Sequence, residues 1–271
     1  MKIPFTKAHG ARNDFLLTHA KDAPGSGLAA AAIAICDRHT GVGADGWLLV
    51  DTGATGDYDL SIRLFNSDGS EVEISGNGTR CAAAFVLGAG LEKSSLRIKT
   101  GAGVKHLRVL KSESPRFEFE MNMGRPVVAE GDLHYLLQLA GGPRDVTIVD
   151  VGNPQCAVFG ADIPANWRKV GAEIEKHSHF PRKTNVSFVK AAGEHSIEVR
   201  FWERGAGETQ SSGTGSTGAA AAAVLRGLVK SPVRVITPAG DLNLRWAGPA
   251  DDFFLVGPAE ITATGEYLLG N

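Results

Sequence analysis

An internal repeat constrains the fold of this chain more than any other feature of its sequence. When the chain is aligned with itself, the segment that starts at Ile62 matches the segment that starts at Val199 without a gap. About 18 of roughly 48 aligned positions are identical, whereas average composition would give about three. The identity extends beyond two Gly- and Ala-rich stretches into mixed, strand-like sequence. We therefore predict two copies of one structural unit.

Each copy predicts the same order of elements. An apolar, β-branched strand (LSIRLF; SIEVRFW) leads into a loop rich in Gly, Ser and Glu, which opens an apolar helix (TRCAAAFVL; STGAAAAAVL). Two further strands follow in each copy (LRIKT and HLRVL; VRVIT and LNLRW). Because both helices are apolar almost all round, we expect each to be buried among its own strands. The alternation over 116–123 predicts a strand at the seam, ended by Gly124 and Pro126. The prediction is two similar α/β halves with a cleft between them.

Composition excludes several classes of protein. With 43% hydrophobic and 21% charged residues among 271, the chain has a globular composition rather than a disordered one. Lys and Arg total 28 against 30 Asp and Glu, so no basic excess suggests nucleic acid as a partner. No apolar run approaches the length of a membrane span, and the N-terminus lacks the apolar core of a secretory signal. The three cysteines, Cys36, Cys81 and Cys156, are far apart, which argues against a zinc site and favours a reducing cytoplasm.

The two copies carry related loops, S-G-N-G at 75–78 and S-G-T-G at 212–215, each at a predicted helix N-terminus. Unpaired amides and the positive end of the helix dipole make such a loop an anion site, and glycine lets a ligand approach the backbone. One Ser-Gly loop alone is commonly just an N-cap. Its duplication at equivalent positions favours a shared site for a carboxylate or a phosphate.

Several asparagines and one charged pair stand in the loops around these two segments. Each asparagine alone is an ordinary turn residue, and the charged pair alone is ordinary solvated surface. Together, amide donors, an arginine and a carboxylate fit a zwitterionic amino acid, which needs donors for its carboxylates and an acceptor for its ammonium group. The residues are Asn13, Asn66, Asn153, Asn185, Glu203 and Arg204.

In chain order, the motifs HGxxNDF, FNSDGSEVxxxGNGTRC, GNPQC, FPxxTNVSF and ERGAGETQxxGTG resemble the diaminopimelate epimerase family. The resemblance spans essentially the whole chain. It implies an α/β (α+β) fold of two pseudo-symmetric halves, each a β-barrel-like sheet wrapped around a central helix. The expected halves are residues 1–123, completed by a last strand at 263–271, and residues 124–262. The resemblance also implies a cytoplasmic isomerase of lysine biosynthesis that forms a homodimer. Such an enzyme is expected to need no cofactor and no metal, and we expect no nucleic-acid or membrane partner.

The resemblance assigns roles to the loop residues around an amino-acid substrate. In the family, two cysteines on opposite faces of the α-carbon act as thiolate base and thiol acid. The ammonium group would be held by Glu203. Asn66, Asn153, Asn185 and Arg204 would hold the distal carboxylate, Asn13 would also line the pocket, and backbone amides of Gly76, Asn77, Gly213 and Thr214 would hold the α-carboxylate.

This chain departs from the family pattern at the proton-transfer groups. The two catalytic cysteines precede GNG and GTG in the family, and here these candidate catalytic positions are Ser75 and Ser212. Cys81 matches the family's other, non-catalytic cysteine, and Gln155 stands where the family usually has histidine after GNP. The pocket also changes, since Gly46 replaces a common glutamine and HGLGNDF has become HGARNDF, with arginine at position 12.

The loss of both thiols has a large chemical consequence. A helix N-terminus can lower a thiol pKa from about 8.5 toward neutrality, but a serine hydroxyl rarely ionises without a base beside it. Serine at one such position does occur in the related proline racemase group. The groups near the loops that are able to act as a base are Glu71, Glu208, Glu203 and His9. For Glu71 and Glu208, which occupy equivalent places in the two copies, bracing of the loop is the favoured interpretation.

Three interpretations stay open on the sequence. The chain is an amino-acid epimerase or racemase of this family with changed chemistry, or a non-catalytic descendant that binds an amino acid, or a Cys-to-Ser variant of a true diaminopimelate epimerase. The first is favoured, because so much of the binding pocket is kept. We do not expect this chain to turn over diaminopimelate.

Overall fold

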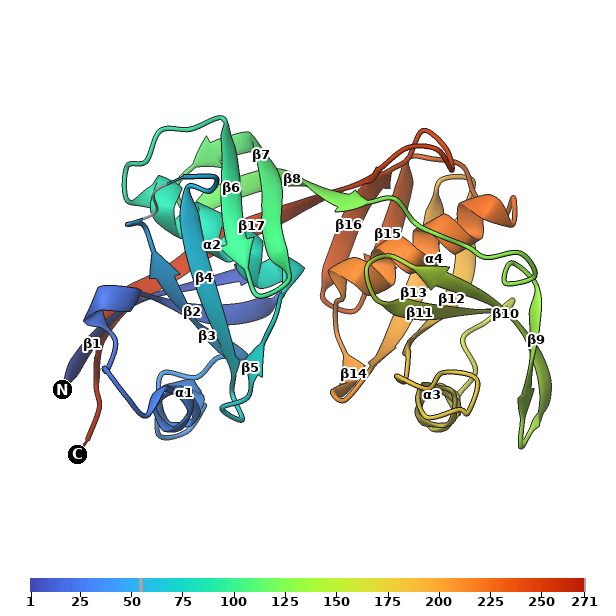
Figure 1. Cartoon of the computed structure of the whole chain (residues 1–271), viewed down its shortest axis with the longest axis horizontal. Helices are drawn as coiled ribbons and strands as arrows, with labels where there is room; N and C mark the ends of the chain where they lie inside the picture. Colours follow the sequence, from blue (N-terminus) through green and yellow to red (C-terminus); the bar gives the residue numbers. More distant parts are fainter. Residues whose placement is uncertain (54–55, 271) are drawn as a thin grey trace. The chain divides into compact units, whose positions relative to one another are not determined.

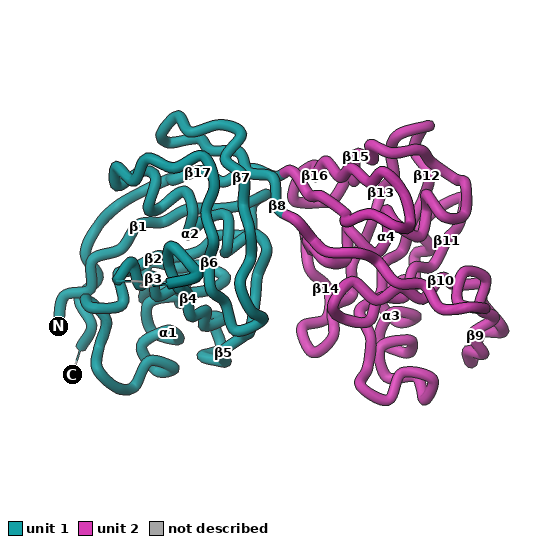
Figure 2. The backbone as a smooth tube through the Cα atoms, turned by 45° about the horizontal axis from the view of Figure 1, so that its top comes forward, with its two compact units in different colours: residues 1–121, 257–271 teal, residues 122–256 magenta. Residues whose placement is uncertain are grey.

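The computed structural model describes residues 1–53 and 56–270. The chain forms two compact units, unit 1 with residues 1–121 and 257–271 and unit 2 with residues 122–256 (Figure 2). No helix in the described part of the chain is long and apolar enough to cross a membrane.

The elements of unit 1 are, in chain order (Figure 1), β1 (Lys2–Gly10), β2 (Asn13–His19), the 3₁₀ turn η1 (Ala20–Asp22), α1 (Leu28–Cys36), β3 (Gly46–Asp51), β4 (Leu60–Asn66), β5 (Glu71–Val72), α2 (Gly76–Gly88), β6 (Ser95–Thr100), β7 (Gly103–Glu113) and β8 (Arg116–Gly124). The elements of unit 2 are β9 (Tyr135–Leu139), β10 (Gly142–Asp150), β11 (Pro154–Phe159), α3 (Trp167–Glu175), β12 (Asn185–Gly193), β13 (Ser196–Glu203), β14 (Gly207–Thr209), α4 (Gly213–Leu225), β15 (Val233–Thr237) and β16 (Gly240–Arg245). The last strand, β17 (Phe253–Leu268), starts in unit 2 and continues through unit 1.

The sheet of unit 1 closes on itself. Its strands are hydrogen-bonded in the order β1, β2, β3, β4, β6, β7, β8 and β17, and β17 pairs back with β1 over Lys2–His9. This ring of strands encloses α2, in which every residue of 77–87 is buried. The predicted burial of this largely apolar helix among its own strands is therefore confirmed.

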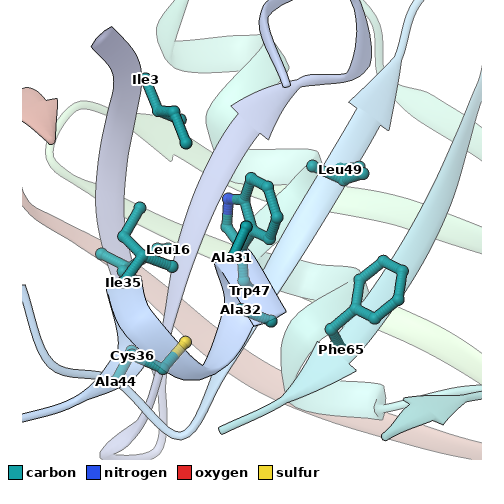
Figure 3. Packing of buried hydrophobic residues seen from close by; sticks show 10 residues of the cluster. All are labelled: Ile3, Leu16, Ala31, Ala32, Ile35, Cys36, Ala44, Trp47, Leu49 and Phe65. Carbon is teal, nitrogen blue, oxygen red and sulfur yellow. The ribbon is translucent and has the colours of Figure 1, made fainter. Parts of the chain in front are cut away.

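The outer face of the first strands of unit 1 is covered by α1. Because side chains alternate along a strand, β3 sends Trp47 and Leu49 to one face and Leu48 to the other. Trp47 and Leu49 pack in one buried cluster with Ile35 and other residues of α1 (Figure 3). Leu48 lies on the α2 side, since a Cβ at Gly78 would be 3.4 Å from its Cδ1. Two covered faces explain why residues 46–50 are all buried.

Unit 2 repeats this plan around α4. β10, β11, β12, β13, β15 and β16 follow one another in the sheet, and residues 215–223 of α4 are buried. The parallel pair β11–β12, which aligns Gln155 with Asn185, corresponds to the parallel pair β2–β3, which aligns Phe15 with Gly46. The helix α3 covers the outer face as α1 does, with the Trp167 ring edge-on to Phe188. The fold is therefore the duplicated α+β architecture that the repeat and the resemblance predict.

Candidate functional site

In unit 1, the loop at 75–78 is an N-cap on α2. Ser75 has extended backbone angles (φ −130°, ψ 124°), and its Oγ accepts a hydrogen bond from the Gly78 amide at 3.1 Å. The amides of Gly76 and Asn77 belong to the first turn and have no partner within the helix. They carry the partial positive charge of the helix N-terminus toward the loop. The loop therefore has free backbone amides of the kind that suit an anion.

In unit 2, Ser212 caps α4 in nearly the same geometry (φ −140°, ψ 123°), with its Oγ accepting from the Gly215 amide at 3.1 Å. Glycine is required at position 215, because a Cβ there would lie 2.8 Å from the Phe201 ring and 2.9 Å from the serine Oγ. The free first-turn amides here are those of Gly213 and Thr214. The two copies therefore share one backbone design.

The asparagine beside the loop of unit 1 is held by a chain of hydrogen bonds. Asn77 Nδ2 donates to Asn13 Oδ1 at 3.1 Å, and Asn13 Nδ2 donates to Asp45 Oδ2 at 2.7 Å. Asp45 in turn pairs with Arg38 at 2.7 Å. Both ends of the Asn13 amide are thus engaged by the protein, and its orientation is fixed.

The corresponding turn of unit 2 holds Asn153 more loosely. Gln155, which is 1% exposed, donates from Nε2 to Asn153 Oδ1 at 2.7 Å. The Asn153 amide nitrogen then points to Thr214 Oγ1 at 3.5 Å, the limit of a hydrogen bond. Gln155 thereby turns the Asn153 donor toward the α4 loop, where it is available to an acceptor on a ligand.

Asn185 and Arg204 meet in unit 2. Asn185 is 8% exposed, donates to the Pro154 carbonyl at 3.1 Å and accepts from the Arg204 backbone amide at 3.0 Å. The Arg204 guanidinium is exposed and donates to the Arg182 carbonyl at 3.2 Å. Asn185 therefore braces the loop that presents Arg204.

Glu203 lies next to the cap of α4. Burial raises the pKa of Glu203, and a hydrogen bond from the Ser212 hydroxyl partly opposes this rise. Because the Ser212 Oγ accepts from Gly215, its own proton is free to be donated to this carboxylate. Ser212 and Glu203 thus form a hydroxyl–carboxylate pair at a helix N-terminus.

Unit 1 has no counterpart of this hydroxyl–carboxylate pair, because Asn66 stands at the position that aligns with Glu203. It ends β4, pairs across the sheet with Gly46, and donates from Nδ2 to Ser70 Oγ at 3.0 Å. In unit 2 the matching places on β12 and β13 belong to Asn185 and Glu203. A Cβ at Gly46 would lie 2.8 Å from the Phe65 carbonyl oxygen, so this backbone has no room for a larger residue at position 46.

The buried thiols and two of the candidate bases are unsuited to proton transfer. Burial raises the pKa of Cys36 and of Cys81 to about 12, and it raises the pKa of Cys156. Glu71 is bound by Arg63 at 2.8 Å, and Glu208 is bound by Arg168 at 2.6 Å. These two carboxylates brace their loops, which leaves Glu203 and His9 among the four candidates.

Buried polar atoms without a hydrogen-bond partner in the described part of the chain gather around both loops. Buried polar groups are satisfied in the great majority of cases, so such a group points to a missing water or ligand. They include Nδ1 of His9 and Nη1 of Arg80 in unit 1, and Oε1 of Gln155, Oγ of Ser211 and Oγ of Ser216 in unit 2. Both loops therefore have unused hydrogen-bonding capacity.

Two residues at these sites were not predicted from the sequence, Glu175 and Arg80. Glu175, at the end of α3 and 4% exposed, accepts from Trp202 Nε1 at 2.9 Å and from the Gly205 amide at 3.1 Å, and so anchors the loop after Glu203. Arg80 is fully buried in α2 and donates to Asn77 Oδ1. A charged residue inside a helix predicted to be buried all round was the signal for Arg80, while nothing in the spacing indicated Glu175.

The two units define a class of duplicated α+β protein in which each half has a serine-capped, glycine-lined helix N-terminus. Comparison with known proteins places the chain within that class. The family model described as diaminopimelate epimerase matches residues 5–129 and 147–262, and the chain belongs to this family.

Individual relatives agree with this assignment. The diaminopimelate epimerase of Pseudomonas fluorescens (strain Pf0-1) is 38% identical over 285 residues, covering 99% of this chain and 100% of the relative. Among solved structures, a Bacillus anthracis phenazine biosynthesis protein of the PhzF family superposes with a TM-score of 0.72 at 16% identity, over 99% of this chain and 100% of that one. A hydroxyproline epimerase from Agrobacterium vitis gives a TM-score of 0.69 at 14% identity, over 98% and 90%. These two likenesses concern the fold alone.

Proposed function

We propose that this chain is a cofactor-independent isomerase of the diaminopimelate epimerase family that binds a zwitterionic amino acid with a second carboxylate. The ligand lies between the two halves and is held by the loops at 75–78 and 212–215. The observation that carries the proposal is the duplicated cap: two helix N-termini with the same serine–amide hydrogen bond, each beside buried polar atoms that have no partner in the described residues. Free amides at a helix N-terminus are suited to a carboxylate.

The roles of the side chains follow from their charge and their free atoms. The amides of Gly76, Asn77, Gly213 and Thr214 take the α-carboxylate. The Glu203 carboxylate takes the α-ammonium group, and the exposed guanidinium of Arg204 takes the distal carboxylate with the Asn153 amide. Asn185 acts through the loop of Arg204, and Asn13 through Asn77, since their amides are used within the protein. Asn66 ends its strand, and its side-chain amide donates to Ser70.

The reaction of this class removes the α-proton on one face and returns a proton on the other. The C–H bond breaks, the electron pair is delocalised into the α-carboxylate, and amides at the helix N-termini stabilise the charge that develops there. Two acid–base groups are needed, and positions 75 and 212 offer hydroxyls. At the cap of α4, the Ser212 hydroxyl is hydrogen-bonded to the Glu203 carboxylate. We expect slow exchange, because a serine hydroxyl rarely ionises and the Glu203 carboxylate beside Ser212 is engaged by the α-ammonium group.

The test is uptake of deuterium at the α-carbon in deuterated water, followed by NMR for a panel of amino acids with and without a second carboxylate. Calorimetry on the same panel measures binding separately. Binding that prefers dicarboxylic amino acids supports the proposal. Exchange or binding confined to amino acids without a distal carboxylate contradicts it.

A second candidate is a binding protein without turnover. Two observations favour it. The three thiols are buried with raised pKa values, and Glu71 and Glu208 are ion-paired with arginines. Tight binding with no exchange above the rate of the free amino acid identifies this function.

Buried free cysteines suit a reducing compartment, so we propose that the protein is cytoplasmic. From the family we also propose a homodimer, which analytical ultracentrifugation tests.

A further inference from the structure

A fully buried arginine lies beneath the anion loop of unit 1. Arg80 is 0% exposed, and its side chain runs back over the first turn of α2, as long side chains in helices do. Its Nη2 donates to Asn77 Oδ1, and its Nε donates to the Pro258 carbonyl at 3.1 Å. Its Nη1 has no hydrogen-bond partner in the described residues, and a Cβ at Gly76 would lie 4.0 Å from it. The free nitrogen is therefore directed at the start of the helix.

This guanidinium is charged, and its hydrogen bonds within the described residues go to an amide oxygen and a carbonyl rather than to a carboxylate. Burial lowers the pKa of Arg80 to about 10, so it stays protonated at neutral pH. Lys7 of β1 pairs with Asp14 of β2 at 3.2 Å, and Arg38 joins Asp14 to Asp45, so these four charges balance. The titratable group of β1 that adjoins Gly10 is His9. A buried charge without an ionic partner is costly to a fold.

The backbone around Arg80 is shaped to accept it. A Cβ at Gly257 would lie 2.8 Å from the guanidinium carbon, so only glycine at this point of β17 leaves room for the side chain. Through Asn77, Arg80 also decides which way that amide faces. Its bond to Asn77 Oδ1 turns Nδ2 toward Asn13, which completes the hydrogen-bond chain to Asp45.

Unit 2 has no positive charge at the place equivalent to Arg80. The alignment of the two copies puts Thr217 at the position of Arg80, and the Thr217 hydroxyl donates to the Gly213 carbonyl at 2.9 Å. The charged group at this loop is the Glu203 carboxylate beside Ser212. Two nearly identical helix N-termini therefore differ in the sign of the nearest buried charge.

We propose that Arg80 supplies a positive charge beneath the N-terminus of α2, so that, of the two helix N-termini that hold a ligand's α-carboxylate, the N-terminus of α2 attracts it more strongly. Arg80 lies beneath the loop and acts in two ways: its electric field reaches the amides of Gly76 and Asn77, and its hydrogen bond orients the Asn77 side chain. It is therefore a positioning residue rather than a catalytic one. The part that concerns the ligand rests on the proposed function, whereas the charge difference between the two loops does not.

The charge difference is measured without any ligand, by thiol reporters at the two caps. Ser75→Cys and Ser212→Cys are made separately, and the rate of alkylation by neutral iodoacetamide is followed against pH. The native chain is the blank, because Cys36, Cys81 and Cys156 are at most 2% exposed. We expect the thiol introduced by Ser75→Cys to have the lower pKa by about one unit or more, which is about tenfold in the ratio of thiolate to thiol. Equal values, or the reverse order, overturn the proposal.

Two further changes assign the difference to Arg80. Arg80→Met in the Ser75→Cys chain is expected to raise the reporter's pKa and slow its alkylation at pH 7 about tenfold. Asn77→Asp keeps a hydrogen-bond acceptor for Arg80, and its negative charge neutralises the guanidinium. This variant is therefore expected to remain folded and to show the same slowing of alkylation at the reporter. Thr217→Val is the matched control in unit 2 and leaves the reporter at 75 unchanged. An unchanged reporter in the folded Asn77→Asp chain overturns the assignment.

Ligand binding is tested by calorimetry with glycine and with diaminopimelate, on chains that keep both serines. Asn77→Asp and Arg80→Met are expected to weaken both ligands about tenfold, because both carry an α-carboxylate. If the unaltered chain binds neither ligand, the proposed function fails, while the thiol reporters still decide the role of Arg80. If it binds them and the Asn77→Asp variant binds them equally well, the inference fails and the proposed function stands.

Discussion

The anion loops of the two units have the same backbone and different side chains. The capping serines have φ of −130° and −140° and ψ of 124° and 123°, and each accepts its amide hydrogen bond at 3.1 Å. Around this common backbone, Arg80 of unit 1 corresponds to Thr217 of unit 2, and Asn66 corresponds to Glu203. Because the backbone amides at the two loops are arranged alike, any difference in how the two loops interact with a ligand has to come from the side chains.

The supports of the loops differ as well. In unit 2, Glu175 at the end of α3 holds Gly205 and Trp202, and hydrogen bonds hold the pKa of this buried carboxyl below its usual value although burial raises it. The end of α1 in unit 1 has Cys36 instead, an apolar residue of the core. In the turn that precedes β2, Arg12 takes a left-handed φ of 62°, whereas Gly152 occupies the matching turn at a φ of 90°. Unit 2 is thus the copy with the unstrained turn and the anchored loop.

The largest expected effect comes from returning thiols to both caps. With the native serines, we expect little or no α-proton exchange on diaminopimelate. Ser75→Cys with Ser212→Cys is expected to raise exchange by about 10²-fold or more, because each thiol restores an acid–base group of suitable pKa. The measurement is deuterium uptake at the α-carbon by NMR. Adding Gln155→His is expected to help more than additively, since groups that act as one unit couple.

The matched control is Ser75→Ala with Ser212→Ala, which removes both hydroxyls and adds no thiol. Full exchange in the unaltered chain would refute this prediction and assign the proton transfer to serine or to a carboxylate such as Glu203. Absence of exchange even in the chain with both thiols and Gln155→His would show a site rebuilt for another ligand.

The next effect separates the two carboxylates of the ligand. Arg204→Ala is expected to weaken binding of diaminopimelate about ten- to a hundredfold, as expected for a charge-assisted hydrogen bond of about 1.5–3 kcal/mol. Glycine, which has no distal carboxylate, is expected to bind as before. Calorimetry on both ligands makes the comparison, with Arg182→Ala as the control, because Arg182 contributes only its backbone carbonyl to Arg204. An equal loss for both ligands would mean that Arg204 only shapes its loop.

The repeat was sufficient to predict the strands and helices that recur in the two copies. α2, α4 and the strands β4, β6, β7, β13, β15 and β16 are all present where the aligned segments predict them. The helix α1 escaped prediction for a physical reason: it begins after Gly27 in a left-handed conformation, with no side-chain cap and no charged residue in its first or last turn. Strand β3 is buried on both faces, so its sequence lacks the alternation that marks a strand.

The candidate site was predictable in outline and not in its contacts. The caps follow from local sequence, because a serine followed by glycine at the start of an apolar helix has one favoured role. The bonds between Asn77 and Asn13 and between Gly205 and Glu175 join residues far apart in the chain, so they depend on how strands and helices pack. The same holds for Glu71 and Glu208, whose arginine partners lie on other elements of the fold.

A smaller effect tests the buried carboxylate of unit 2. Because burial raises the pKa of Glu203, the folded chain favours its protonated form. The stabilising contribution is complete below the unfolded pKa of about 4.3 and is lost as the pH rises through the folded value. Glu203→Gln is therefore expected to be more stable than the native chain at pH 7, and the gain should shrink at pH 4. The midpoint of urea unfolding at the two pH values measures this.

Glu71→Gln in unit 1 provides the contrast. Its ion pair with Arg63 lowers the pKa of Glu71, so its contribution is present above the unfolded pKa and is lost as the pH falls. The pair is exposed, and the loss at pH 7 is expected to be at most about 1 kcal/mol. A gain of stability from both variants, or from neither, would remove the distinction between the two carboxylates.

The smallest effect compares the caps themselves. Ser75→Ala is expected to cost about 1 kcal/mol, the usual value of an N-cap, measured by hydrogen exchange of the α2 amides. Ser212→Ala removes the same kind of cap from α4 and also the hydroxyl that donates to Glu203, so exchange of the α4 amides should report a larger cost. In a double-mutant cycle with Glu203→Gln, the excess should disappear, because a neutral amide does not need that donor as a carboxylate does. Equal costs at the two caps in the native background would mean that the Ser212–Glu203 contact contributes nothing, and the difference between the units would then reduce to the charge of Arg80.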